Sequence, residues 1–479
     1  MNYQEFINSK KKIKQEKGIE LNQDDLNEKL FDYQKAIVQK ALKLKKFCLF
    51  ESCGMGKTLQ QLEWAYQVHK HTNKPVLILA PLGVTIQTAK EEAPKLGYEC
   101  NIIEKEIING LNITNYEQLD NIDTSVFSGV VLDESSILKN FTGKVRVALT
   151  NAFKDTEYKL CCTATPSPND LMELLNHADF LGITTTAKAL ANYFINDMKT
   201  GDWRLKGHAT KDFYRWCCTW SINIESPQDL GYEAKYYKLP KLIEEQVIID
   251  IDEIDDDFSN GLFREIGTSA TSFHKEKHRT AKDRAMKCAE IVNKDDEQYL
   301  VWCDTNEEAD LLKKYIPEAV EVRGSDKPKF KEQSAMDFKS GKIRVLISKP
   351  KIFGYGMNFQ KCRNVVFCGL TYSYENYYQA LRRIYRFGQE RDVYSYIVLG
   401  STELHILENI NKKKETQAIL KNQMDLSTKE IQLLNFNGKE VKKIDQFKTI
   451  DLPKFLWVTK YIMMTVLMFA VNCLMIVLI

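Results

Sequence analysis

Short apolar segments alternate with longer helical patterns in two separate blocks of the chain, and this alternation limits the possible folds more than any other feature of the sequence. The first block extends from about Phe31 to Leu181, and the second begins near Tyr299. We expect strands at 47–50, 76–79, 130–132 and 159–163 in the first block, and at 299–302, 345–347, 365–367 and 394–398 in the second. Strands that alternate with helices predict a parallel sheet with helices on both faces. The expected fold class is therefore α/β.

The 479 residues are enough for about three domains. The expected division is a polar leader at 1–30, a first α/β unit at 31–181, a helical insertion and linker at 182–285, a second α/β unit at 286–430, a C-terminal extension at 431–460 and a hydrophobic tail at 461–479. A hydrophobic content of 44% is ordinary for globular proteins, so each unit can bury a core.

The overall composition excludes some classes of function. The 67 Lys and Arg residues and the 65 Asp and Glu residues leave a net charge of +2, which excludes binding of nucleic acid by bulk charge alone but allows a local basic groove. The 12 cysteines contain no CxxC motif, so neither a zinc site of standard spacing nor a secreted disulfide framework is expected. Reduced thiols and a polar, lysine-rich N-terminus without the features of a signal peptide favour a cytoplasmic location.

The strongest functional signal is the segment Glu51-Ser-Cys-Gly-Met-Gly-Lys-Thr58, which lies between a predicted strand and a predicted helix. Gly54 and Gly56 allow backbone N–H groups to approach phosphate groups closely. We expect Lys57 to place its charge on the β- and γ-phosphates and the Thr58 hydroxyl to bind Mg²⁺. Only the first position departs from the usual GxxxxGK[ST] pattern, which has glycine there. The segment therefore predicts a loop that binds a nucleotide together with Mg²⁺.

Two carboxylates directly follow the predicted strand at 130–132. Asp133 can hold Mg²⁺ through water, as an acid at a strand end does in nucleotide hydrolases. Glu134 can polarise the attacking water as a general base. A further apolar segment ends in Thr163-Ala-Thr-Pro166, whose small hydroxyl residues could couple a nucleotide site to a neighbouring surface.

The second block contains a basic segment around Arg383 and Arg386. These arginines are three residues apart, so on a helix they would share one face. An arginine that reaches the γ-phosphate from another domain stabilises the charge that develops in phosphoryl transfer. The alternative is a solvated basic helix, which this segment alone does not exclude.

The order of these segments resembles the superfamily 2 helicases, specifically the Swi/Snf-type ATPases that translocate on double-stranded DNA, in the compact variant carried by phages and mobile elements. The resemblance covers about 31–417, roughly four-fifths of the chain. The family's nucleotide loop is similar to [DE]xxGxGKT, so the acidic Glu51 fits it. Gln34 resembles the upstream glutamine that contacts adenine. Further similar motifs are Leu79–Pro81 and Thr114–Glu117 on the DNA side of the first lobe, Thr163–Asp170 as the coupling motif, Gly354–Asn358 in the second lobe, and Gln379, Arg383, Arg386 and Gln389 in QAxxRxxRxGQ.

This resemblance implies two RecA-like lobes with ATP and Mg²⁺ in the cleft between them. The implied site residues are Gln34, Gly54, Gly56, Lys57, Thr58, Asp133 and Glu134 from the first lobe, and Arg383 and Arg386 from the second. The implied function is ATP-dependent translocation on double-stranded DNA with low sequence specificity, because phosphate contacts position a protein without reading sequence. Two alternatives stay open, namely a helicase that unwinds RNA or forked DNA, and a membrane-anchored ATPase or adaptor.

The C-terminal segment Tyr461–Ile479 contains 19 residues without a charge, which is the length of a short membrane-spanning helix. Lys454 and Lys460 on its N-terminal side would suit a tail anchor with the rest of the protein in the cytoplasm. The segment could instead be a buried hydrophobic helix or an aberrant end of the reading frame, and we slightly favour the last of these. We expect ATP hydrolysis to be independent of residues 458–479.

Overall fold

The computed structural model describes residues 18–104, 106–140, 143–197, 203–233, 237, 239–250, 270–353 and 358–437. The first 17 residues, the glycine-rich motif at 354–357, and the extension and hydrophobic tail from 438 onwards lie outside the described residues. The chain divides into two compact units, Met1–Gln432 and Leu433–Ile479, and both α/β lobes belong to the first unit.

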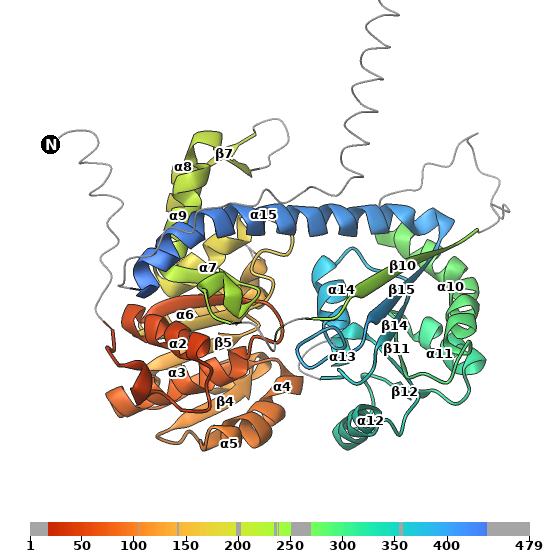
Figure 1. Ribbon diagram of the computed structural model, residues 1–479, viewed down its shortest axis with the longest axis horizontal. Coiled ribbons are helices and arrows are strands. Elements are labelled where there is room, and N and C mark those ends of the chain that lie inside the picture. The colour runs from red at the N-terminus through yellow and green to blue at the C-terminus, as the bar shows by residue number, and fades with distance from the viewer. Residues whose placement is uncertain are drawn as a thin grey trace, which may run out of the picture. The chain divides into compact units, whose positions relative to one another are not determined.

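The first lobe is built on a seven-stranded parallel sheet with the strand order β3-β4-β2-β5-β6-β1-β9. Its strands are β1 (Lys46–Glu51), β2 (Val76–Ala80), β3 (Cys100–Ile102), β4 (Leu111–Asn115), β5 (Gly129–Asp133), β6 (Tyr158–Thr163) and β9 (Ser221–Ile224). Its helices are α2 (Asp32–Leu44), α3 (Lys57–Thr72), α4 (Leu82–Gln87), α5 (Ala93–Lys95), α6 (Lys144–Ala152) and α7 (Glu173–Leu181), and they cover the sheet (Figure 1). Short 3-10 turns at Gln23–Asp25, Tyr116–Asn121, Thr124–Val126 and Ser135–Lys139 and a π turn at Thr88–Glu92 complete it. The four strands expected in the first block are confirmed.

The second lobe is a six-stranded parallel sheet with the order β10-β15-β14-β11-β13-β12. Its strands are β10 (Leu242–Ile249), β11 (Tyr299–Trp302), β12 (Val320–Val322), β13 (Val345–Ser348), β14 (Asn364–Cys368) and β15 (Val393–Gly400). Its helices are α10 (Ala270–Val292), α11 (Asn306–Tyr315), α12 (Pro328–Ser340), α13 (Pro350–Phe353) and α14 (Tyr374–Leu381), with a 3-10 turn at Ser401–Glu403. Alternate residues of β11 enter two separate core clusters, Leu300 and Trp302 in one and Tyr299 and Val301 in the other. This alternation shows that both faces of the sheet are buried, as the apolar segments predict.

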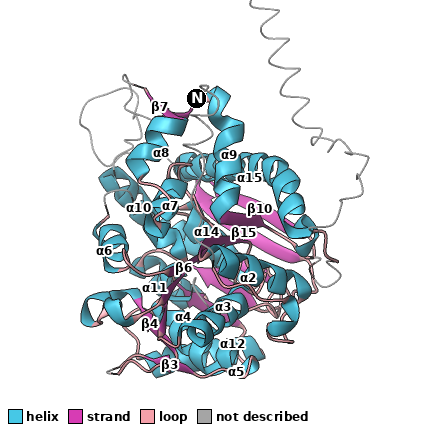
Figure 2. Cartoon of the chain, turned by 90° about the vertical axis from the view of Figure 1, so that its left-hand side faces the viewer, coloured by secondary structure: helices cyan, strands magenta, loops and turns pink. Residues whose placement is uncertain are grey.

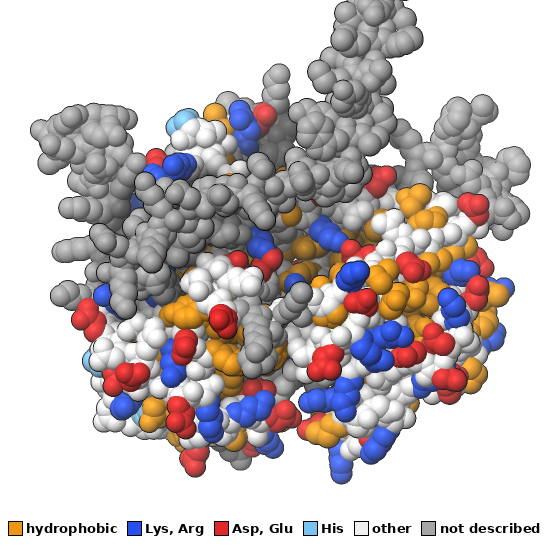
Figure 3. Space-filling view, viewed as in Figure 1, with side chains coloured by type: hydrophobic (Ala, Val, Ile, Leu, Met, Phe, Trp, Pro, Cys, Tyr) orange, Lys and Arg blue, Asp and Glu red, His pale blue; other side chains and the backbone are white. Residues whose placement is uncertain are grey.

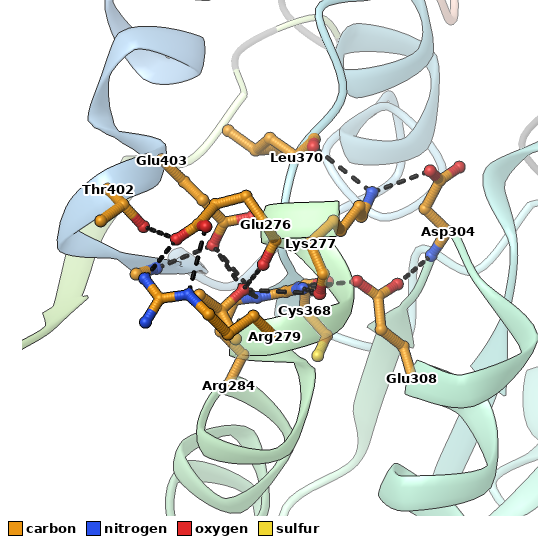
Figure 4. A network of polar contacts seen from close by, with 12 residues as sticks. Glu276, Lys277, Arg279, Arg284, Asp304, Glu308, Cys368, Leu370, Thr402 and Glu403 are labelled. Atoms are coloured by element: carbon orange, nitrogen blue, oxygen red, sulfur yellow. Dashed lines mark hydrogen bonds and ion pairs between the residues drawn. The ribbon is translucent and has the colours of Figure 1, made fainter. Parts of the chain in front are cut away.

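A buried ionic network fixes α10 to the second sheet (Figure 4). The fully buried Arg284 guanidinium pairs with Glu308 of α11 at 2.7 Å and with Glu403 at 3.1 Å, and it also donates to the carbonyl oxygen of Cys368 at the end of β14. A Cβ atom added to Gly369 would lie 2.2 Å from the same guanidinium, so this position requires glycine. The two carboxylates therefore compensate a charge that burial alone would strongly disfavour.

The segment 182–285 differs from the expected helical insertion because it also contains strands. It comprises α8 (Thr186–Tyr193), the antiparallel pair β7 (Phe194–Asn196) and β8 (Trp203–Leu205), α9 (Thr210–Trp220), β9, β10 and the start of α10, with 3-10 turns at Gly207–Ala209 and Pro227–Leu230. Strand β9 pairs with β1 and so completes the first sheet, whereas β10 pairs with β15 along its whole length. Both are edge strands, and β10 is partly exposed along its length. Edge strands do not need the continuous apolar run by which the central strands were predicted.

Helix α15 (Leu404–Asn437) leaves the second lobe and also contacts the first lobe (Figures 1 and 2). The Lys413 ammonium donates to the carbonyl oxygen of Tyr372 at 2.8 Å and to Asn169 at 3.2 Å, and Gln417 donates to the carbonyl oxygen of Ser167. Within the part of the chain that the structure describes, no helix combines the length and the apolar character needed to cross a membrane.

Candidate functional site

The loop between β1 and α3 has the backbone geometry of a phosphate-binding loop. Gly54 and Gly56 have φ angles of 93° and 76°, in the left-handed region that favours glycine. The Gln34 amide donates to the carbonyl oxygen of Met55 at 3.0 Å, and a Cβ atom added to Gly56 would lie 2.2 Å from that amide nitrogen. Gln34 of α2 is therefore seated directly against the loop.

Lys57, the first residue of α3, points back into the loop. Its ammonium donates to the carbonyl oxygens of Glu51 at 2.7 Å and Ser52 at 3.1 Å. Burial alone would lower the pKa of Lys57, but Cys53 and the surrounding carboxylates raise it above its ordinary value. The side chain therefore carries its positive charge at neutral pH. Thr58 follows as the second residue of the helix and is partly buried.

The two predicted carboxylates lie at the end of β5, each with a specific partner. The Asp133 carboxylate accepts from the Gln61 amide at 2.7 Å, and the backbone carbonyl oxygen of Asp133 accepts from the Tyr116 hydroxyl at 2.6 Å. The Glu134 carboxylate accepts from the Thr163 hydroxyl at 3.3 Å. Glu134 has φ 55° and ψ 55°, a left-handed conformation that is rare for residues other than glycine and that concentrates at functional sites.

Burial raises the pKa values of both acids, and repulsion from Asp133 adds to the rise at Glu134, while charges from both lobes lower them. Burial raises the pKa of Asp133, and burial followed by the charge of Asp133 raises the pKa of Glu134 to about 7. Lys57 of the first lobe and Arg383 of the second lobe act in the opposite direction on both carboxylates. Arg383 is therefore close enough to the acid pair to act on its charge.

The expected placement of Arg383 and Arg386 on one helical face is wrong, because α14 ends at Leu381 and both arginines lie in the turns that follow. The Arg383 guanidinium folds back onto Gln379 and donates to its carbonyl oxygen at 3.1 Å and to its side-chain oxygen at 3.0 Å. Arg386 donates to the side chain of Asn358. Burial, followed by repulsion from Arg383, lowers the pKa of Arg386 to about 10. These side-chain bonds, and not helical periodicity, set the directions of the two guanidinium groups.

The two lobes touch at the phosphate loop. The Cys53 thiol lies 3.9 Å from the side-chain oxygen of Gln379, and a Cβ atom added to Gly54 would lie 3.1 Å from the Cβ atom of Phe387. An ion pair between Lys139 and the buried Glu375 also joins the lobes. The predicted residues of both lobes thus meet at one place.

Sequence reasoning missed the polar residues that hold this site together. Gln61 and Tyr116 bond to Asp133, and Ser135 bonds to His177 at 3.1 Å. Gln61 lies four residues after Lys57, so helical spacing could have placed it on the same face of α3. No local signal pairs Ser135 with His177, because 42 positions separate them in the sequence.

The donor set fits Mg²⁺ and a triphosphate. Thr58 and Asp133 offer hydroxyl and carboxylate oxygens, which are hard ligands that Mg²⁺ prefers, and Mg²⁺ usually takes one or two protein ligands with waters and phosphates. Among the described residues there is no group of three or more His, Cys, Asp or Glu side chains that could hold a metal ion alone.

Two family models match the chain. The SNF2-related domain model matches residues 56–205, and the helicase conserved C-terminal domain model matches residues 281–388. The chain belongs to the Swi/Snf-type superfamily 2 helicases. The matches fall on the two lobes, and this Swi/Snf-type protein is accordingly an ATP-hydrolysing enzyme.

Curated relatives of this Swi/Snf-type chain include a phage protein, in agreement with the compact variant that the motifs predict. Protein p41 of Acyrthosiphon pisum secondary endosymbiont phage 1 is 26% identical over 469 residues, covering 81% of this chain and 97% of the relative. The uncharacterized ATP-dependent helicase YqhH of Bacillus subtilis (strain 168) is 23% identical over 457 residues, covering 82% of this chain and 79% of the relative. Among solved structures, the Sulfolobus solfataricus SWI2/SNF2 ATPase core in complex with dsDNA is 17% identical, covering 87% of this chain and 97% of that chain with a TM-score of 0.40.

Proposed function

We propose that this protein is a motor that hydrolyses ATP on double-stranded DNA and moves along it with low sequence specificity. The observation that carries the proposal is the contact between the lobes at the phosphate loop, where the Cys53 thiol lies 3.9 Å from the side-chain oxygen of Gln379 and Lys139 pairs with Glu375. Hydrolysis can then depend on the relative position of the lobes, because the arginine and the acids belong to different lobes. A motor requires such a dependence.

Each predicted site residue takes one role in this proposal. Gln34 contacts the adenine, and the loop amides around Gly54 and Gly56 together with Lys57 hold the phosphates. Thr58 and Asp133 hold Mg²⁺, which supplies positive charge to the phosphate oxygens when bound. Glu134 accepts a proton from the attacking water. Arg383 and Arg386 stabilise the charge of the transferred phosphoryl group.

Lys349 and Lys351 are candidates for contacts to the DNA backbone. They line a cavity of about 140 Å³ at the carboxyl ends of β11, β13 and β14, together with Asp304 and Asn376. Asp304 is already paired with the buried Lys277 at 2.8 Å, so its charge is compensated. The visible surface carries acidic and basic side chains in a mixed pattern (Figure 3). Because the net charge of the chain is close to zero, binding of DNA phosphates would depend on local lysines such as these.

The test is an ATPase assay with duplex DNA, single-stranded DNA, duplex RNA and single-stranded RNA at rising salt concentrations. We expect duplex DNA of any sequence to stimulate hydrolysis and added salt to weaken the effect through counterion competition. Displacement of the third strand of a triplex would separate translocation from strand opening. Stimulation by RNA alone, or unwinding of forked DNA without triplex displacement, would favour the unwinding helicase instead.

Variants at the lysines sharpen this test. Lys349→Ala and Lys351→Ala should weaken the stimulation by DNA of every sequence to the same extent. Each substitution should also reduce the slope of log DNA affinity against log salt concentration by about 1. Lys287→Ala is the matched control, because Lys287 lies on α10 in a surface ion pair with Glu290. Equal effects of all three substitutions would show that the cavity has no special part in binding DNA.

A further inference from the structure

We propose that His177 of α7 is a positioning residue for ATP hydrolysis. It acts by fixing the backbone of the loop that carries Glu134. The inference rests on the proposed role of Glu134 as the general base. Neither the nucleotide loop nor the acidic motif contains His177, and the proposed function assigns it no role.

The conformation of Glu134 needs support from its surroundings. The left-handed conformation is strained for a residue with a Cβ atom, and it persists only where neighbouring structure holds it. Glu134 adopts this conformation between the last residue of β5 and the 3-10 turn at Ser135–Lys139. A change in this short turn would rotate the Glu134 carboxylate away from its bond with Thr163.

His177 bonds to the first residue of that turn. Its Nε2 atom lies 3.1 Å from the Ser135 hydroxyl, and its Nδ1 atom lies 3.3 Å from the carbonyl oxygen of Glu173. A carbonyl oxygen can only accept, so the proton is on Nδ1 and Nε2 accepts from Ser135. Burial lowers the pKa of His177 to about 4, so the ring stays neutral and the direction of this hydrogen bond is fixed at neutral pH. Both residues are fully buried.

The neighbouring side chain on α7 holds the other end of the same turn. The Asn176 amide donates to the carbonyl oxygens of Leu138 at 2.9 Å and Lys139 at 3.1 Å. Two adjacent buried residues of one helix thus bond to the start and the end of the loop that follows Glu134. This arrangement holds the loop at both ends.

Helix α7 is itself anchored in the core and linked to the coupling motif. The His177 ring packs edge to face on Phe50 of β1 with ring centres 5.2 Å apart, and Phe180 belongs to the same core cluster. At the start of α7, Glu173 accepts from the backbone N–H and the side-chain amide of Asn169 at 3.1 and 2.9 Å. A shift of the segment around Asn169 therefore reaches the Glu134 loop through α7.

The experiment compares His177→Leu, Ser135→Ala and the double variant in the full chain. We expect His177→Leu to lower kcat about 10-fold or more, because small displacements of catalytic groups have large effects on rate. Binding of a fluorescent ATP analogue should stay within about 2-fold of wild type, since the phosphate loop is unchanged. In the double variant the thermal stability lost in His177→Leu should return, because no buried hydroxyl is left unpaired. Its kcat should stay low, because the loop is still released.

Two further variants separate the possible explanations. Phe180→Leu on the same helix should lower the melting temperature without changing kcat, and Glu134→Gln should abolish hydrolysis. A normal kcat in His177→Leu, or a kcat that recovers together with stability in the double variant, would show that His177 only packs the core. Normal hydrolysis by Glu134→Gln would instead overturn the proposed role of Glu134, independently of any result at His177.

Discussion

Replacement of Glu51 by glutamine should stabilise the folded protein at alkaline pH. Glu51 is the last residue of β1 and is fully buried, immediately before the phosphate loop. One carboxylate oxygen accepts from the Gln60 amide at 2.9 Å, and the other has no hydrogen-bond partner among the described residues. Burial raises the pKa of Glu51 from 4.5 to about 7. The folded chain therefore carries an acid that is costly to ionise.

The size and the sign of the effect follow from this pKa. The difference between 4.5 and about 7 corresponds to about 3 kcal/mol at about 1.4 kcal/mol per pH unit. The folded state binds the proton more tightly than the unfolded state, so the stability contributed by the protonated acid is fully present below pH 4.5. It is lost as the pH rises through about 7. Glutamine has nearly the same shape and no charge, so Glu51→Gln should keep this stability at high pH.

The assay is thermal unfolding of the wild type and Glu51→Gln at pH 5 and pH 8. We expect a clear rise in melting temperature at pH 8 and a much smaller one at pH 5. Glu332→Gln serves as the control, because Glu332 lies exposed on α12 and its substitution should change little at either pH. A shift of the same size at both pH values, or a loss of stability at pH 8, would refute the reasoning from burial.

Three other substitutions test the site and the second lobe. Lys57→Ala should lower ATP hydrolysis by on the order of 10²-fold or more while the chain still folds, and activity within a few fold of wild type would contradict the phosphate-loop assignment. Arg383→Ala should bind ATP nearly normally but lose about 10³-fold in DNA-stimulated turnover, and a variant that simply stops binding nucleotide would contradict a role in the transition state. Arg284→Leu should destabilise the second lobe by about 3–5 kcal/mol in denaturant unfolding, because Glu308 and Glu403 stay buried without their counter-charge, and an unchanged midpoint would show that they are compensated elsewhere.

The central strands and the phosphate loop could be predicted because their signals are local. A parallel strand buried on both faces reads as a continuous apolar run, so β1, β2, β5 and β6 of the first lobe and β11, β13, β14 and β15 of the second were all predicted. The loop from Glu51 to Thr58 is equally local, since glycine supplies the left-handed angles at fixed positions between a strand and a helix. The order of these motifs along the chain was also enough to identify the family.

The edge strands and the side-chain geometry of the site could not be predicted in this way. Strands β9 and β10 come from the connecting segment and carry no long apolar run, so they become strands only because β1 and β15 offer unpaired edges. The end of α14 at Leu381 moved Arg383 and Arg386 off the helix that their spacing had suggested. For the edge strands, a partner distant in the sequence decides the local structure.

The sequence by itself therefore determined the fold class, the two lobes and the chemical types of the candidate catalytic groups, because periodicity and short motifs depend on neighbouring residues. Only the tertiary structure decided which partner each catalytic group receives. Gln61 reaches Asp133 across 72 positions, and His177 reaches Ser135 across 42. Such hydrogen bonds form because folding buries polar groups that must then find a partner, and the nearest partner in space is set by the packing of the sheet and its helices.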